Sequence, residues 1–364
     1  MSFNEADVQS ALKNLIDPNT RKDFVSGKSV KNIKISGNDV SLDIMLGYPA
    51  QSVWGEIRAM VEAHLKAALP NSGGVSVKVT SQVVPHAVQR GAKLVDGVKN
   101  IIAVASGKGG VGKSTTAVNI ALALAAEGAR VGMLDADIYG PSQPTMLGIS
   151  GQPNTIGGNF MEPMTNHGLQ AMSIGFLIAN DDTPMIWRGP MVVQALDQLL
   201  RQTRWDNLDY LIVDLPPGTG DIQLSLAQQV PVTGAVIVTT PQDIALMDAR
   251  KGLKMFEKVG IKIVGIVENM STHICSKCGH EEHIFGAGGG EKMCADYNTE
   301  LLGSLPLDIR IREQTDSGNP TVVADPNGNI ARVYKQIARR IAVKVAEMAQ
   351  DHSAAFPKIV VQNT

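Results

Sequence analysis

The residues with the clearest chemical meaning form a glycine-rich segment that ends in a lysine and two hydroxyl residues. The segment matches the pattern G-x-x-x-x-G-K-[ST] and lies between an apolar run and a helical pattern. Its glycines allow backbone N–H groups and a helix N-terminus to face phosphate oxygens. We expect Lys113 to reach the β- and γ-phosphates of ATP and Ser114 to ligate Mg²⁺. The predicted nucleotide-binding residues are Gly107, Lys108, Gly109, Gly110, Val111, Gly112, Lys113, Ser114 and Thr115.

Acidic residues follow two other apolar runs that the sequence predicts as strands. Asp214 ends the run Leu211–Val213, and Asp135 and Asp137 follow the run Val131–Leu134. Because metal and phosphate sites form at the carboxyl ends of parallel strands, we expect Asp214 beside Mg²⁺. Asp135 or Asp137 is a candidate for orienting the attacking water or holding a metal-bound water. Spacing alone does not assign these two roles, and a pair of solvated loop carboxylates is the alternative.

Two of the three cysteines form a C-x-x-C pair, Cys275 and Cys278, in a histidine-containing stretch. Such a turn brings two thiolates together at the spacing that a metal requires, but a tetrahedral site needs four ligands. The same pair from a second subunit would complete a Cys₄ set for a [4Fe–4S] cluster. A zinc site within one chain and a redox or inert pair of thiols are the alternatives. The further ligands for zinc would come from His273, His280, His283 and Cys294.

The elements that must position these residues alternate between short apolar runs and helical patterns from about residue 100. Near-continuous apolar strands joined by crossovers predict a doubly wound α/β fold, with a mostly parallel sheet covered on both faces. We expect strands at Ile101–Ala105, Val131–Leu134, Tyr210–Val213, Ala235–Thr239 and Ile263–Val267. Helical patterns cover Lys113–Glu127, Met191–Arg201, Leu246–Val259 and a last helix, over residues 330–348, that we expect to pack on the sheet.

A small α+β domain precedes this unit. Residues 1–84 predict a helix over residues 8–16, two strands joined by a hairpin turn, a second helix and a last strand. We expect a linker at 85–99 and a P-loop ATPase domain at 100–350. A C-x-x-C insertion lies near 270–290 within that domain, and residues 351–364 form a C-terminal tail.

Composition narrows the class of protein further. The 364 residues include 33 basic and 35 acidic side chains, a net charge of −2, which gives no electrostatic reason to expect nucleic acid as a partner. No apolar run approaches the length of a membrane span, and the polar N-terminus does not resemble a secretory signal. Three cysteines are too few for a disulfide scaffold. We therefore expect a cytoplasmic protein with no membrane partner.

Several segments together resemble the Mrp/ApbC family of iron–sulfur cluster carrier ATPases. The likeness spans about residues 98–350, and residues 1–84 are similar to the small domain that bacterial members carry. Lys108, an additional lysine inside the glycine loop, also resembles the deviant Walker A motif of the nitrogenase-iron-protein, MinD and ParA class. The matching segments are GKGGVGKST at 107–115, DADIYGPS at 135–142, IVDLPPGTGD at 212–221, TTPQDIAL at 239–246, and ENMS with C-x-x-C and IFGAGGG at 268–290.

The resemblance implies a homodimer that hydrolyses ATP slowly and transfers clusters to apo iron–sulfur proteins. Cys275 and Cys278 would bind a [4Fe–4S] cluster shared between two subunits, with an iron–sulfur assembly scaffold as a possible donor. The histidines near the thiols, His273, His280 and His283, depart slightly from the family pattern. A zinc site therefore remains an alternative. The competing functions are those of a MinD/ParA-like positioning ATPase and of a nucleotide switch with a structural zinc site.

The same resemblance implies roles around the nucleotide. Lys108 would act in trans on the phosphates of the facing subunit, while Lys113 would act within its own site. Asp137 and Asp214 would serve the attacking water and the metal. Asn269 lies where related ATPases contact adenine.

Overall fold

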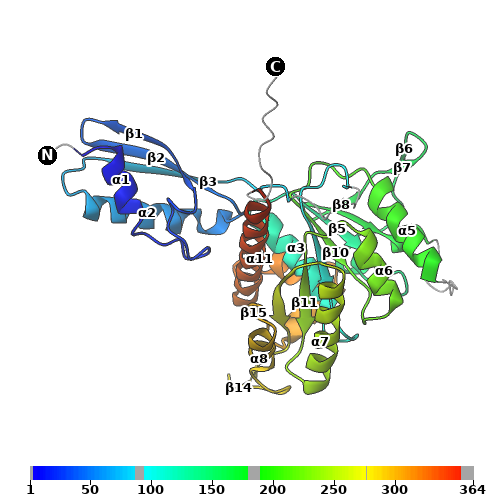
Figure 1. The fold of residues 1–364 in the computed structure, drawn as a ribbon. Helices are drawn as coiled ribbons and strands as arrows, with labels where there is room; N and C mark the ends of the chain where they lie inside the picture. Colours follow the sequence, from blue (N-terminus) through cyan, green and yellow to red (C-terminus); the bar gives the residue numbers. More distant parts are fainter. Residues whose placement is uncertain (1–2, 87–93, 179–188, 276, 354–364) are drawn as a thin grey trace. The chain divides into compact units, whose positions relative to one another are not determined.

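The computed structural model describes residues 3–86, 94–178, 189–275 and 277–353 (Figure 1). Its backbone contacts divide the chain into two compact units. One comprises residues 1–84 with 126–128, and the other comprises residues 85–125 with 129–364.

The N-terminal unit packs two helices on a three-stranded sheet of order β1-β2-β3. Strands β1 and β2 are antiparallel, whereas β2 and β3 are parallel because helix α2 connects them. Alternate residues of β2, from Val40 to Leu46, are buried against the apolar side of α2. The elements are α1 (Glu5–Leu12), β1 (Val30–Ser36), β2 (Asp39–Leu46), η1 (Gln51–Val53), α2 (Trp54–Ala68) and β3 (Val75–Ser81).

The first helix is shorter than the sequence pattern predicts. It starts at a capping box formed by Asn4 and Asp7 and ends at Leu12. Ile16, which we expected on its apolar face, is exposed and forms an isolated antiparallel bridge with Asp23. The prediction was too long because apolar residues keep the helical spacing up to Ile16, although the helix ends at Leu12.

The second unit is built on an eight-stranded sheet of order β15-β12-β11-β4-β10-β5-β9-β8. All neighbouring strands are parallel except β8 and β9. The five predicted strands are present within one residue at each end, and four of them are buried at every position. The strands are β4 (Ile101–Ala105), β5 (Val131–Asp135), β8 (Met164–Asn166), β9 (Leu169–Ser173), β10 (Tyr210–Asp214), β11 (Gly234–Thr239), β12 (Ile263–Glu268) and β15 (Leu301–Ser304).

Helices cover both faces of this sheet, so the doubly wound α/β prediction is confirmed. The chain moves from β4 to β5 in one direction and from β10 to β11 in the other, and right-handed crossovers therefore place α3 and α6 on opposite faces (Figure 1). The helical segments are α3 (Lys113–Ala126), α4 (Gln143–Met146), η2 (Ile174–Phe176), α5 (Gly189–Gln202), α6 (Asp221–Gln229), α7 (Asp243–Lys258), α8 (Gly289–Asp296), α9 (Ile309–Asp316), α10 (Thr321–Ala324) and α11 (Asn329–Ser353).

Two small antiparallel pairs lie outside the main sheet. One joins β6 (Thr155–Ile156) to β7 (Phe160–Met161), and the other joins β13 (His273–Ile274) to β14 (Glu281–Glu282). The second pair carries the C-x-x-C segment. No helix within the described ranges has the length and apolar character needed to cross a bilayer.

Candidate nucleotide and thiol sites

The glycine-rich loop runs from the end of β4 to the start of α3, and its conformation requires glycine at specific positions. Gly110 and Gly112 have φ angles of 81° and 78°, which side-chain-bearing residues rarely adopt. A side chain at Gly107 would overlap the backbone of Asp248 on α7, and one at Gly112 would overlap the amide of Asn269. The loop is therefore held closely between α7 and the end of β12.

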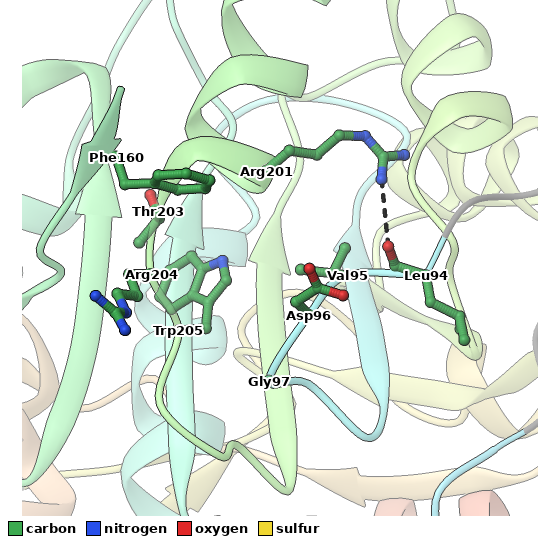
Figure 2. A pocket seen from close by; sticks show the side chains of 9 residues that line it. All are labelled: Leu94, Val95, Asp96, Gly97, Phe160, Arg201, Thr203, Arg204 and Trp205. Atoms are coloured by element: carbon green, nitrogen blue, oxygen red, sulfur yellow. Dashed lines mark hydrogen bonds between the residues drawn. The ribbon is translucent and has the colours of Figure 1, made fainter. Parts of the chain in front are cut away.

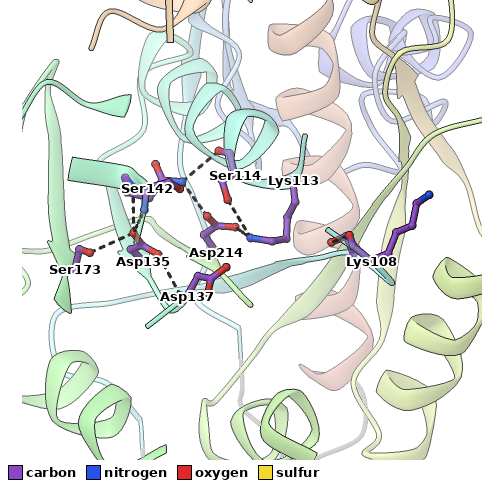
Figure 3. A network of polar contacts seen from close by, with 10 residues as sticks. Lys108, Lys113, Ser114, Asp135, Asp137, Ser142, Ser173 and Asp214 are labelled. Atoms are coloured by element: carbon purple, nitrogen blue, oxygen red, sulfur yellow. Dashed lines mark hydrogen bonds and ion pairs between the residues drawn. The ribbon is translucent and has the colours of Figure 1, made fainter. Parts of the chain in front are cut away.

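A buried ion pair lies at the end of this loop. Lys113 Nζ contacts Asp214 Oδ1 and also lies 3.1 Å from Ser114 Oγ, while the two charged side chains are 6% and 0% exposed (Figure 3). Asp214 ends β10, directly beside β4, so the parallel register brings this carboxylate to the glycine loop. A hydroxyl and a carboxylate are oxygen ligands of the kind that Mg²⁺ prefers, so Ser114 and Asp214 fit the predicted metal.

Asp135 lies beside Asp214 because the register of β5 and β10 pairs these two residues directly. Its buried carboxylate accepts hydrogen bonds from the Ser173 hydroxyl at 3.2 Å and from the backbone N–H groups of Ser142 and Gln143, each at 3.0 Å (Figure 3). Burial, reinforced by the charge of Asp214, raises the pKa of Asp135 to about 7. The carboxylate therefore holds the following loop in place.

Asp137 lies two residues further along and is half-buried. Its backbone N–H donates to Asp135 Oδ1 at 3.1 Å, and its own carboxylate lies near Asp214 in Figure 3. Burial raises the pKa of Asp137, although Lys113 opposes this effect. Unlike Asp135, this carboxylate is partly open to solvent, as a residue that contacts water must be.

The two remaining predicted nucleotide residues differ in where they lie. Asn269 is buried at the end of β12, and its Nδ2 donates to the carbonyl of Val111 in the glycine loop at 2.9 Å. The side chain of Lys108 extends away from the cluster around Lys113 and Asp214 (Figure 3). The structure thus brings Asn269 to the loop but leaves the Lys108 ammonium outside its own site.

Gln143 belongs to the same cluster but was not predicted from the sequence. It starts helix α4 and is 1% exposed, and its Nε2 donates to Ser114 O at 3.2 Å and to Asp214 Oδ2 at 3.0 Å. Its position directly after the segment DADIYGPS was the only signal in the sequence. A single glutamine forms no recognisable sequence pattern. Its contacts with Ser114 and Asp214 depend on how α4 packs, which the sequence does not indicate.

The predicted thiol site lies on the β13–β14 hairpin. Cys275 N–H donates to His280 O at 2.9 Å, and Gly279 N–H donates to Cys275 O at 2.8 Å, which closes the turn. Cys278 is exposed and Cys275 is partly exposed. The backbone N–H groups of Cys278 and Lys277 lower the pKa of the Cys275 thiol.

The histidines near the thiols contact backbone carbonyls. His273 Nδ1 lies 3.0 Å from Leu307 O, and His283 Nδ1 lies 2.8 Å from Ser271 O. Across the described residues, no group of three or more His, Cys, Asp or Glu side chains could hold a metal ion. The zinc site considered for a single chain is therefore not assembled in that part of the chain.

The third cysteine, Cys294, one of the residues considered as a zinc ligand, is buried on α8. Burial, together with the charges of Glu268, Glu300 and Glu291, raises the pKa of its thiol to about 11. A thiol in this state is a poor metal ligand, because metals bind the thiolate.

Described residues of the second unit also line other pockets. One, of about 500 Å³, is lined by residues 94–97, Phe160, Arg201 and residues 203–205 (Figure 2). Its Arg201 is engaged by Leu94 O at 3.4 Å and by Asp197 at 2.7 Å. Because it adjoins the segments that precede β4 and β10, it lies at the opposite edge of the sheet from the glycine loop. Another, of about 550 Å³, is lined by His273, Ile274 and the starts of α9 and α11.

A parallel sheet with a glycine loop after its central strand and a buried lysine–aspartate pair at that loop defines the class of P-loop NTPases. The family model described as NUBPL iron-transfer P-loop NTPase matches residues 97–342. A second model, described as iron-sulfur cluster assembly protein, matches residues 5–79. The chain belongs to the NUBPL iron-transfer P-loop NTPase family.

Similar proteins from bacteria and mouse agree with this family. The chain is 49% identical to the iron-sulfur cluster carrier protein of Escherichia coli K12, over 93% of this chain and 91% of the relative. It is 59% identical to the protein of the same name from Pseudomonas fragi, over 75% and 97%. The mouse iron-sulfur cluster transfer protein NUBPL is 52% identical, over 68% and 78%.

Solved structures show a similar fold. A nucleotide-binding protein from Archaeoglobus fulgidus, in complex with ADP, is 34% identical with a TM-score of 0.56, over 65% of this chain and 92% of that chain. The cell division ATPase MinD of Pyrococcus furiosus is 23% identical with a TM-score of 0.50, over 66% and 98%, and shows a likeness of fold alone.

Proposed function

We propose that this chain is an ATP-hydrolysing carrier that binds a [4Fe–4S] cluster between two identical subunits and transfers it to apo-proteins. The observation that carries the proposal is that one edge of the sheet bears both a glycine-rich loop with a buried lysine–aspartate pair and an open pair of thiols. The glycine loop follows β4, and the thiol hairpin follows β12, so both leave the carboxyl ends of parallel strands. The relatives named iron-sulfur cluster carrier protein support this function.

At the nucleotide site, each residue has a defined task. Lys113 leaves Asp214 for the β- and γ-phosphates of ATP, and Asn269 contacts the adenine. Ser114 and Asp214 would hold Mg²⁺, which would supply positive charge against the phosphates. Asp137 orients the water that attacks the γ-phosphorus as the bond to the ADP oxygen breaks, because Asp135 already has its oxygens engaged.

Each nucleotide site is completed by a residue of the second subunit. The Lys108 ammonium, directed away from its own site, reaches the phosphates of the facing subunit and makes hydrolysis depend on dimer geometry. Hydrolysis is accordingly slow in the absence of a partner protein.

The cargo is bound by Cys275 and Cys278 of both subunits. Only two thiolates per chain hold the cluster, and they lie on an exposed hairpin, so thiolates of a recipient can replace them. An assembly scaffold supplies the cluster in the cytoplasm, and residues 1–84 form a domain of the iron–sulfur-assembly type. Neither membrane nor nucleic acid takes part.

The decisive experiment measures iron, acid-labile sulfide and zinc per chain in anaerobically purified protein. The wild type is compared with Cys275→Ala and with Cys294→Ala, the matched control in which the buried cysteine is replaced. One cluster per dimer corresponds to about two irons and two sulfides per chain. We expect this content in the wild type and the control, and its loss in Cys275→Ala. About one zinc per chain without sulfide would contradict the carrier function.

A further inference from the structure

Gln143 joins the two elements that flank the predicted metal position. Its side chain spans from Ser114 O on the first turn of α3 to Asp214 Oδ2 at the end of β10, at 3.2 Å and 3.0 Å. Its backbone N–H donates to Asp135 Oδ2 at 3.0 Å. One residue thus contacts the start of the nucleotide helix and both buried carboxylates.

The orientation of the Gln143 amide follows from its partners. A backbone carbonyl and a carboxylate only accept hydrogen bonds, so both must face the NH₂ group rather than the amide oxygen. The oxygen, Oε1, is buried and has no hydrogen-bond partner among the described residues. Because an unpaired buried acceptor costs stability, Oε1 is suited to accept a hydrogen bond from a ligand or from a water at the metal position.

We infer that Gln143 is a positioning residue of the magnesium site. By holding Asp214 Oδ2, it leaves Oδ1, the oxygen now paired with Lys113, to face the metal when Lys113 turns to the phosphates. Its Oε1 accepts a hydrogen bond from a water of the bound metal. The inference rests on the proposed nucleotide site and adds to it a residue that neither the motif nor the comparisons assign.

The test distinguishes the contribution of the metal to ADP binding from the contribution of the nucleotide alone. The dissociation constant of ADP is measured by calorimetry with Mg²⁺ and with EDTA, and the ratio of the two constants gives the enhancement due to the metal. Gln143→Met keeps the length of the side chain but removes its donor and its acceptor. The matched control is Gln170→Met, because the Gln170 amide also makes two hydrogen bonds, both to Asp206 and away from the glycine loop.

For Gln143→Met we expect the metal enhancement to fall about five- to tenfold, with binding in EDTA unchanged within about twofold. Gln170→Met should match the wild type in both conditions. An unchanged enhancement in Gln143→Met would overturn the inference. An equal loss with and without metal would overturn it too, because Gln143 would then act only on the shape of the glycine loop.

Gln143→Asn keeps the amide on a shorter side chain and provides a second variant if Gln143→Met does not fold. It cannot span both partners, so its metal enhancement should also be reduced, and a value equal to that of the wild type would argue against the inference. If the wild type binds no ADP in either condition, the proposed nucleotide site fails. If the wild type binds ADP and the Gln143 variants have the same metal enhancement, only the role of Gln143 is refuted.

Discussion

The nucleotide site and the thiol site are built in opposite ways, although both follow the ends of strands in one sheet. The nucleotide site lies where β4, β5 and β10 end, and its two central carboxylates, Asp135 and Asp214, are completely buried. The thiol site lies on a hairpin with two residues in each strand, and Cys278 is exposed. The proposed nucleotide site, which would control charge, is enclosed, whereas the proposed cluster site, which would release its cluster to another protein, is open.

Burial also determines how each site controls protonation. In the enclosed site, loss of solvent and a neighbouring charge raise the pKa of Asp135. In the open site, the backbone N–H groups of Cys278 and Lys277 lower the pKa of Cys275, although partial burial opposes this shift. The first mechanism depends on the whole sheet, whereas the second depends on a single turn.

The largest change in a measured activity should come from Lys113→Met. This variant tests whether the nucleotide site can be disabled while the thiol site still binds its cluster. Removing the cation paired with Asp214 should reduce ATP hydrolysis about a hundredfold or more, by analogy with the loss of a charge-stabilising group in other active sites. Iron and sulfide content should stay at the wild-type level, because the hairpin does not use Lys113. Hydrolysis is measured by phosphate release. Loss of the cluster in this variant would show that the sites are not separable.

Thiol reactivity should distinguish the cysteines nearly as strongly. At pH 7.5 Cys294, with its pKa raised to about 11, has about a hundredfold less thiolate than an unperturbed thiol. Iodoacetamide should therefore modify Cys275 and Cys278 in the apo-protein well before Cys294, as peptide mass spectrometry can follow. If Cys294 reacted first, the assignment of open and enclosed thiols would be reversed.

A pH dependence of stability tests the enclosed site. The pKa of Asp135 is raised to about 7 in the folded chain, from 3.8, so the folded state holds a proton that the unfolded state releases between these values. Stability from this group is therefore lost as the pH rises towards 7. Between pH 6 and pH 8 the wild type should lose about 1 kcal/mol more unfolding free energy than Asp135→Asn. Chemical denaturation at both pH values measures this difference, and equal losses would contradict the shifted pKa.

The smallest effect should come from Asn269→Ala. This variant removes the hydrogen bond to Val111 O and should weaken ADP binding about two- to tenfold. Asn166→Ala is the matched control, because it removes a similar bond, to Leu147 O at 2.7 Å, outside the glycine loop. Equal affinities for both variants and the wild type would leave Asn269 without a role at the nucleotide.

Most of the sheet and the centre of the nucleotide site could be predicted because their signals are local. Strands such as Ile101–Ala105 are apolar throughout, and the glycine loop has a fixed spacing. The edge strand β15 and strand β9, which lies between β5 and the edge strand β8, were missed because they mix apolar residues with glutamine, glycine and serine. The pairing of Asp135 with Asp214 needed the register of two strands that are far apart in the chain.

The ion pair between Lys113 and Asp214 has a consequence for the order of events. The Lys113 ammonium lies between the carboxylate and the Ser114 hydroxyl. A divalent ion that binds before the nucleotide would be repelled by the positive charge beside its ligands. We therefore expect the nucleotide-free protein to have little affinity for magnesium. On the proposed function, the metal would enter together with the phosphates, which would draw the lysine aside. The magnesium position would then stay empty until nucleotide arrives.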